Sequence, residues 1–95
     1  MAEQDNNRAI VTIVGPDRVG IIAGIANLLA EANVNIIDIS QSVMREFFVM
    51  IMMVEVGAAN LPFDQLKARL QEKGRSLTVN VDIQREDIFK AMHRV

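Results

Sequence analysis

The sequence contains no cysteine, no tryptophan and no tyrosine, and it has one histidine among its 95 residues. Without cysteine the chain can form no disulfide, no thiolate nucleophile and no cysteine-based metal site, which is typical of proteins in a reducing compartment. The formal net charge is -2 at pH 7. This balance argues against a nucleic-acid or membrane partner, because both favour a concentrated basic surface.

Long apolar segments are also missing. The longest apolar run covers residues 47–54, which is too short to cross a bilayer. Residues 1–7 are polar and have no apolar stretch of the kind that a secretory signal needs. A chain of this size can bury the core of one small domain. We therefore expect a cytoplasmic protein with a disordered tail over residues 1–7 and a single domain over residues 8–95.

What the sequence does contain is a strand, a tight turn and a helix in immediate succession. Residues 9–14 are rich in β-branched side chains and predict a buried strand. Residues 21–30 repeat large apolar side chains at helical spacing. Between them, Gly15-Pro16-Asp17-Arg18-Val19-Gly20 predicts a tight loop in which Asp17 is the helix N-cap. Unpaired amides at a helix start attract carboxylates and phosphates, so this loop predicts a site for a small anionic ligand.

The segment after this helix predicts a β-hairpin. Residues 36–45 alternate between apolar and polar side chains, as a strand near a sheet edge does. The polar pair Arg45-Glu46 predicts the turn, and residues 47–56 predict a strand that is apolar on both faces. Three apolar side chains of the hairpin's first strand, residues 36–45, are predicted to be buried: Ile37, Ile39 and Val43.

The last third of the chain predicts a helix, a strand and a terminal helix. Pro62 suits the first turn of the helix, and Gly74 is expected to cap its end. Residues 77–84 alternate like a strand with one exposed face. Apolar residues from Ile88 to Val95 predict a short terminal helix, with Glu86 on a solvated surface.

This order, βαββαβ plus a terminal helix, predicts an α+β, ferredoxin-like sandwich with both long helices on one face of an antiparallel sheet. The first and third strands are apolar on both faces and are expected at the centre, which gives the strand order 4-1-3-2. The other face of the central strands is also apolar, so a second copy of the chain is expected to cover part of it. We therefore expect a homodimer.

With this fold, the loop from Gly15 to Gly20 and the turn Asn33-Val34-Asn35-Ile36, the chain resembles ACT domains. It is most similar to small stand-alone (UPF0237-like) ACT proteins, which resemble the amino-terminal half of the glycine cleavage system repressor. The resemblance extends over residues 8–84. It implies that an amino acid or a related small molecule binds between two domains, held by the first loop and the start of the second strand.

The resemblance places this role on six residues. Asp17, Arg18, Gly20 and Asn35 match the family's pattern, and Gly15 belongs to the same loop. Many members have proline where this chain has Val19, which leaves the helix start less rigid without removing its amides. The candidate ligand-binding residues are therefore Gly15, Asp17, Arg18, Val19, Gly20 and Asn35.

A purely structural interpretation of these residues stands beside the functional one. Gly15 and Gly20 would then serve only the backbone conformation or close packing, and Asp17 only helix capping. Asn35 is equally suited to contact a ligand through its amide or to hold the turn before the second strand.

Other residues with chemical potential favour ordinary roles. His93 is close to the chain end, a poor place for catalysis, and no Gly-x-Ser-x-Gly motif is present. Met50 and Met52 share one face of a strand and are expected to fill the core rather than bind Cu(I). Asp38 and Asp82 are expected to be solvated. We therefore expect no catalytic residues, no metal site and no cofactor.

Three functions follow in order of preference. The first is a ligand-sensing regulatory domain that acts as a homodimer on a separate enzyme or regulator. The second is a ligand-free subunit that regulates a partner through protein–protein contacts. The third is RNA binding on the same strand order, which the adjacent Phe47 and Phe48 disfavour because they lie on opposite faces without a basic platform.

Overall fold

Seven secondary-structure elements follow one another in the predicted order. The computed structural model describes residues 7–16 and 20–92. The elements are β1 (Arg8–Pro16), α1 (Ile21–Glu31), β2 (Asn35–Met44), β3 (Phe47–Glu55), α2 (Phe63–Leu77), β4 (Asn80–Arg85) and α3 (Glu86–Met92).

The four strands form one antiparallel sheet in the order β2-β3-β1-β4. This confirms the predicted order 4-1-3-2, since the two descriptions differ only in the edge from which they start. The register places Ile13 of β1 opposite Met50 of β3 and Val81 of β4. The strands that are apolar on both faces are therefore the central ones, as the pattern predicts.

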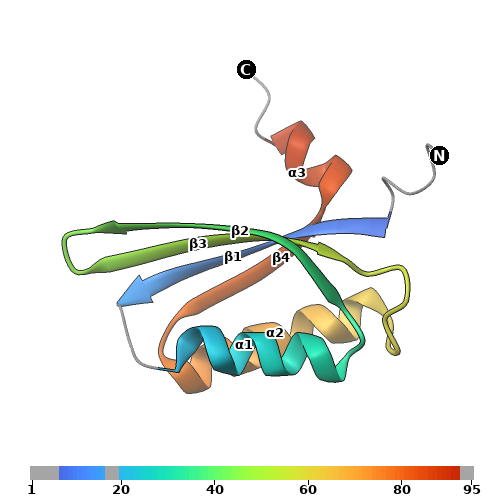
Figure 1. Cartoon of the computed structure of the whole chain (residues 1–95), viewed down its shortest axis with the longest axis horizontal. Helices are drawn as coiled ribbons and strands as arrows, with labels where there is room; N and C mark the ends of the chain where they lie inside the picture. The colour runs from blue at the N-terminus through green and yellow to red at the C-terminus, as the bar shows by residue number, and fades with distance from the viewer. Residues whose placement is uncertain (1–6, 17–19, 93–95) are drawn as a thin grey trace.

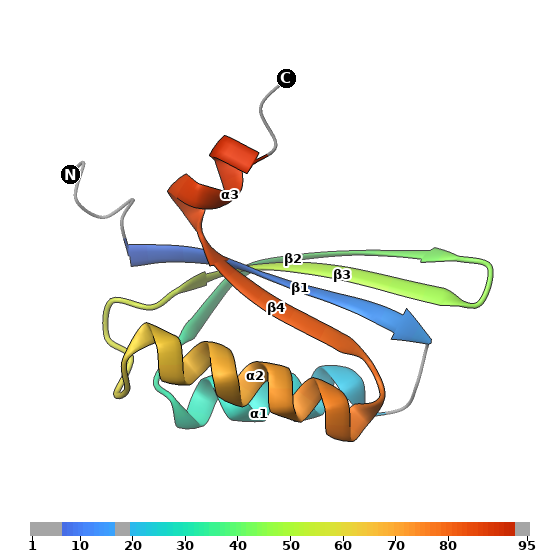
Figure 2. The same cartoon turned by 180° about the vertical axis from the view of Figure 1, so that it is seen from behind.

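The two long helices lie on one face of the sheet and α3 lies on the other, as Figures 1 and 2 show. The core fills the space between the sheet and the two long helices. Within the described residues, no helix is long and apolar enough to span a membrane. The largest fully buried side chains come from five of these elements: Val11, Ile13, Ile21, Ile25, Leu29, Met50, Met52, Val54, Leu66, Leu70 and Ile83.

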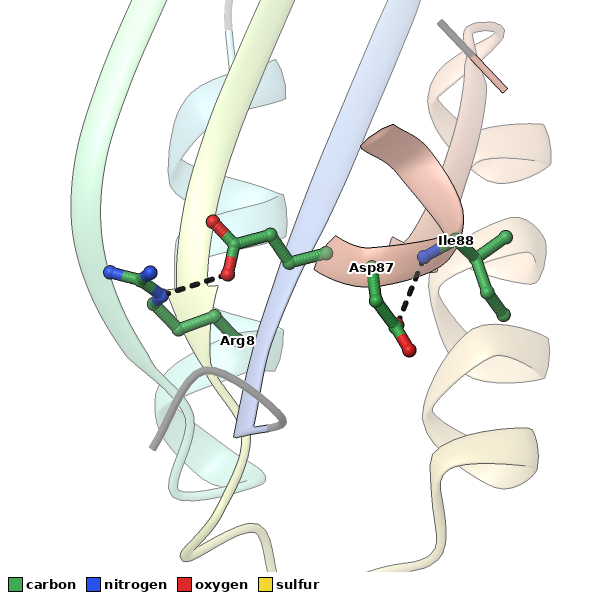
Figure 3. A network of polar contacts seen from close by, with 4 residues as sticks. Arg8, Asp87 and Ile88 are labelled. Atoms are coloured by element: carbon green, nitrogen blue, oxygen red, sulfur yellow. Dashed lines mark hydrogen bonds and ion pairs between the residues drawn. The ribbon is translucent and has the colours of Figure 1, made fainter. Parts of the chain in front are cut away.

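The short helix α3 is fastened to the first strand by an ion pair. Arg8 Nε donates to Glu86 Oε1 at 3.0 Å (Figure 3), and the two side chains are 33% and 7% exposed. The next residue, Asp87, accepts a hydrogen bond from the Ile88 amide at 2.9 Å. The expectation that Glu86 is solvated is wrong, because its carboxylate is buried against β1 to reach Arg8. Ile10 of β1 lies on the same side of the sheet as α3 and is also buried, at 5% exposure.

The prediction that the apolar side chains of β2 are buried is wrong. Ile37, Ile39 and Val43 are 46%, 44% and 55% exposed. A register shift after Ile36 leaves Ile37 without a partner on β3. Ile39 and Val43 face the helix side of the sheet, opposite Met52 and Phe48. In Figure 1 the turn end of the β2–β3 hairpin projects beyond α1, so no helix covers the end of β2 that holds Val43.

Gly74 does not cap α2, contrary to prediction. The helix continues to Leu77, and its C-cap is Thr78 at φ 65°. Gly74 is buried inside the helix, where a Cβ atom would lie 2.7 Å from Val81 Cγ2 and 2.8 Å from the Val79 carbonyl oxygen. The glycine therefore permits close packing of α2 on β4.

Candidate functional site

The loop predicted between the first strand and the first helix begins later than expected, because β1 continues through Gly15 and Pro16. Beyond Val14, β1 pairs only with β3, so the missing amide hydrogen of Pro16 removes no bond to β4. Gly15 is buried, and a Cβ there would lie 2.8 Å from Val79 Cγ1. Packing alone therefore requires glycine at this position.

Gly20, rather than the predicted Asp17, is the N-cap of α1. Its φ of 93° is a left-handed conformation that glycine adopts without strain, so the chain enters the helix only after this residue. The first helical bond runs from the Gly24 amide to the Gly20 carbonyl at 2.9 Å. Among the described residues, no heavy atom lies within 4 Å of a Cβ built at Gly20.

The amide groups at the start of α1 have no partner within the helix itself. The amides of the first turn (residues 21–23) precede the first donor of the helical ladder. No described side chain caps this end, and the first turn holds no acidic residue. The positive end of the helix dipole is therefore uncompensated among the described residues, which suits an anion. Asp17, Arg18 and Val19 lie outside the described residues, so their predicted roles stay predictions.

Asn35 lies at the opposite end of the sheet from this connection. It is the first residue of β2 and is paired with Glu55, which is in turn opposite Arg8 at the start of β1. The 11 residues of α1 separate it from Gly20, which amounts to about 16 Å of helix. The structure thus brings Gly15 and Gly20 to one connection, whereas Asn35 of the same chain is remote from both.

Two other asparagines hold the turn before β2. Asn33 has a φ of 61°, and its side-chain amide donates to the Ala58 carbonyl at 2.9 Å. Asn60 donates from its side chain to the Glu31 carbonyl at 2.9 Å. The turn-holding role that the sequence left open for Asn35 therefore belongs to Asn33 and Asn60. The role of Asn33 could have been predicted from the sequence, because asparagine readily adopts the left-handed conformation that such a turn needs. The sequence around Asn60 gives no indication that its side chain contacts the end of α1.

The acidic residue with a shifted pKa is Asp82 on β4. Partial burial raises the pKa of Asp82, but hydrogen bonds from the Ile83 amide and Gln84, together with Lys67, outweigh it and leave the value below the ordinary one. Lys67 Nζ lies 3.5 Å from Asp82 Oδ1, and Gln71 donates to the same oxygen at 3.3 Å. These contacts form a surface network across the edge of β4. Among the described residues, no three His, Cys, Asp or Glu side chains are grouped to hold a metal ion.

The methionine and phenylalanine predictions are confirmed. Met50 and Met52 are fully buried on the helix side of β3. Phe48 is 3% exposed, whereas Phe47 is 52% exposed on the other face of the strand. The two phenylalanines therefore form no shared stacking surface.

Comparisons with known proteins agree with this architecture. The family model for the ACT domain matches residues 7–84. A UPF0237 protein of Listeria monocytogenes is 49% identical over 88 residues, which are 93% of this chain and 99% of that protein. The structure of an ACT domain protein from Streptococcus pneumoniae has a TM-score of 0.76 at 40% identity, covering 90% of this chain and 97% of that one. A candidate glycine cleavage system transcriptional repressor, at 23% identity and a TM-score of 0.68, covers 81% of this chain and 44% of its own, and shares the fold.

Proposed function

Because the chain belongs to the ACT domain family, a family of regulatory ligand-binding domains, we propose that it is an amino-acid sensor. It acts as a cytoplasmic homodimer and regulates a separate enzyme or regulator rather than catalysing a reaction. The observation that supports this most is the start of α1, where no described side chain caps the helix and no described heavy atom lies within 4 Å of a Cβ built at Gly20.

The ligand carboxylate accepts hydrogen bonds from the first-turn amides of α1. The helix dipole adds to this attraction, because no acidic side chain of the first turn offsets it. By the family resemblance, the carboxylate of Asp17 faces the ligand ammonium, and the backbone at Arg18 and Val19 completes the loop around it.

A second copy of the chain completes the site. Asn35 is remote from Gly20 within one protomer, so a single chain cannot use both on one small ligand. Antiparallel pairing of β2 with β2 of a partner subunit reverses the strand direction. The start of the partner's β2 then lies near Met44, at the end of the sheet where the Gly15–Gly20 connection lies. Asn35 of the partner subunit reaches the site in this arrangement.

The edge of β2 suits such pairing. The strand is 10 residues long and contains Asp38 as its one charged residue and no proline. Edge strands that avoid association usually carry several charges or a proline. Three of its apolar side chains are exposed although they belong to a sheet, and a partner strand would cover them: Ile37, Ile39 and Val43.

Ligand binding is tested by thermal melts of the purified protein with each standard amino acid. A ligand at a hundred times its Kd stabilises the native state by about 2.7 kcal/mol, which raises the Tm of a domain this small by roughly 10 °C or more. Asp17→Ala should abolish the shift for the amino acid that gives it while leaving the protein folded. Asp64→Ala is the matched control, since Asp64 occupies the first turn of the other long helix. Unchanged affinity of Asp17→Ala would contradict the site.

Dimerisation is tested by analytical ultracentrifugation of Ile39→Lys. A lysine at this position places a charge on the pairing edge, so the variant should be monomeric and should lose the ligand-induced shift. Ile88→Lys is the control, because Ile88 on α3 is 46% exposed and Ile39 is 44% exposed. If both variants sediment like the wild-type protein as dimers, the β2 edge is not the interface.

The second candidate function is a ligand-free subunit that regulates a partner protein. It draws support from the sheet face opposite the long helices, where Val14 and Ile51 are each 39% exposed and Phe47 is 52% exposed. A flat amino-acid panel, combined with a partner that binds the wild-type protein and not Ile51→Lys, would favour this function over sensing.

A further inference from the structure

The outer edge of β2 suits one pairing register with a second copy of the chain. We infer that two copies join through residues 38–44 of β2, with Gln41 of each copy at the two-fold axis. The inference rests on the dimer proposed above and specifies which residues of the two copies meet. Because β2 is an edge strand of each four-stranded sheet (Figure 1), the joined sheets form one antiparallel sheet that runs through both copies.

The regular part of β2 sets the length of the pairing. A register shift between Ile36 and Asp38 interrupts the pairing of β2 with β3, and a bulge of this kind bends a strand and disturbs its ladder. From Asp38 to Met44, each residue of β2 pairs with one residue of β3. A two-fold axis that pairs this segment with itself over its full length passes through its middle residue, Gln41.

The side chains of this segment alternate between the two faces of the sheet. Ile39, Gln41 and Val43 are opposite buried residues of β3, so they face the helix side. Ser40 and Ser42 face the other side. Residues that are opposite each other in an antiparallel pair share a face. With Gln41 at the axis, Ile39 is therefore opposite the partner's Val43, and Ser40 is opposite the partner's Ser42.

This register covers exposed apolar side chains with apolar side chains. Ile39 and Val43 are 44% and 55% exposed in one copy. Each of them meets the other type across the new strand pair, and the two-fold axis repeats this contact, so four exposed side chains are covered. Gln41 is exposed as well. Its amide both donates and accepts, so the two copies of Gln41 can hydrogen-bond to each other across the axis.

The charges at the two ends of the segment are also complementary. Asp38 is opposite the partner's Met44 in this register, which places it next to the partner's Arg45. Asp38 and Arg45 are both exposed, and neither forms an ion pair with another described residue. Opposite charges across a strand pair favour that pairing. The axis repeats this contact too, so both ends of the paired segment join a carboxylate to a guanidinium.

A two-fold axis at Ser40 matches the chain less well. Ile39 would then be opposite the partner's Gln41, so an apolar side chain would meet an amide on the helix side. Val43 would be opposite the partner's Ile37, which lies in the bulge where the strand is irregular. The paired segment would therefore include the bulge instead of ending before it.

A two-fold axis at Ser42 is disfavoured by charge. Asp38 would be opposite the partner's Glu46, and like charges that are directly opposite destabilise a strand pair. Val43 would be opposite the partner's Gln41, which again sets an apolar side chain against an amide. The axis at Gln41 thus avoids both the mismatched pairs and the repulsion.

The test uses single cysteines, because the chain has none of its own. Opposite Cα atoms in an antiparallel pair are about 4.5–5.5 Å apart, which is within the range of about 4.4–6.8 Å that a disulfide spans. Gln41→Cys should therefore form a covalent dimer on mild oxidation, measured by non-reducing gel electrophoresis. In Ser40→Cys the two cysteines are two residues apart along the strand, about 8 Å between Cα atoms, which is too far for a disulfide.

Two further samples complete the experiment. A mixture of Ser40→Cys and Ser42→Cys should give the mixed covalent dimer, although neither variant forms a covalent dimer alone. Ser76→Cys is the control for random collision, since Ser76 is exposed on α2 away from this edge, and it should stay monomeric on the gel. A covalent dimer of Ser40→Cys or Ser42→Cys alone, or none of Gln41→Cys, would overturn the register.

The outcome for the register is separate from the outcome for amino-acid sensing. The oxidised Gln41→Cys dimer should keep the rise in Tm that the amino-acid ligand gives to the wild-type protein. If no amino acid raises the Tm of the wild-type protein and Gln41→Cys still forms the covalent dimer, sensing fails and the pairing stands. If an amino acid raises the Tm but Gln41→Cys forms no covalent dimer, the protein is a sensor and this register is wrong.

Discussion

Replacement of Gly74 by alanine should destabilise the protein, although the same change stabilises most helices. In a helix interior, alanine is favoured over glycine by about 0.8–1.0 kcal/mol. At Gly74 the new methyl group would lie 2.7 Å from Val81 Cγ2 and 2.8 Å from the Val79 carbonyl oxygen. Both distances are far below van der Waals contact, and one of the two atoms belongs to the backbone. Overpacking costs about 1–3 kcal/mol. The backbone contact places this change in the upper part of that range, about 2–3 kcal/mol, so the net loss should be about 1–2 kcal/mol.

The measurement is a pair of thermal melts and urea titrations against Gly24→Ala. Gly24 is also inside a helix, but its nearest neighbours are the flexible ends of Leu77, at 3.1 Å, and Lys73, at 3.3 Å. These side chains can move, so Gly24→Ala should raise the Tm slightly. Gly74→Ala should lower it by about 5–10 °C, since each kcal/mol corresponds to about 4–8 °C.

A double variant identifies the contact responsible. Val81→Ala removes the Cγ2 atom that the new methyl group would meet, so Gly74→Ala should cost less in that background than in the wild-type protein. If Gly74→Ala melts at or above the wild-type temperature, α2 packs less closely on β4 than these distances require.

Three further predictions concern individual interactions. Glu86→Gln should lose about 1–2 kcal/mol, because it removes the charge attraction of the part-buried Arg8–Glu86 ion pair, and hydrogen exchange should show faster exchange in α3; Asp87→Asn, which is exposed, should have a smaller effect. Asp82→Asn should flatten the acid side of the stability–pH curve. Because the folded pKa of Asp82 is lowered, its contribution is complete above the unfolded pKa of about 3.9 and decreases as the pH falls through the folded value. Urea titrations of variant and wild type should therefore differ more at pH 7 than near pH 2. Gly20→Ala should cost about 1–2 kcal/mol through its left-handed backbone, and Gly20→Asn should cost less; equal melts for all three proteins would contradict the assigned conformation.

Periodicity predicted the elements and their order because each strand and helix shows its buried face locally. The strand order followed from which strands are apolar on both faces, and the sheet places β1 and β3 at the centre. Alternation alone does not reveal how far a helix layer extends. Val43 has the pattern of a buried residue, but it lies next to the turn end of β2, which projects beyond α1.

The errors share a cause, which is contact between distant parts of the chain. Gly74 follows a lysine near the end of an apolar stripe and so has the local features of a helix cap. The requirement for glycine comes from Val81, which lies on another element. Glu86 likewise has the local features of a solvated first-turn residue, and its partner Arg8 is 78 residues away.

The candidate site could be predicted in part. The sequence indicated a helix start with free amides next to glycine, and the described part of the connection has that form. Asn35 was assigned to the same site as the loop by the family resemblance, which implies a ligand held between two domains. Antiparallel topology places them at opposite ends of the sheet, which one sequence does not reveal until the direction of each strand is known.

The two edges of the sheet differ, and this difference limits how large an assembly can become. On β4, the six-residue edge is covered by charged and polar groups, since Lys67 and Gln71 of α2 reach Asp82. On β2, the edge is long and carries a single charge. A chain whose sheet has two exposed edge strands can bind another copy at each edge, and such chains can form fibres. A chain with one exposed edge strand has no free edge left after it pairs with one other copy. The polar contacts at β4 therefore disfavour growth of the assembly at that edge, whereas the β2 edge permits pairing with one other copy.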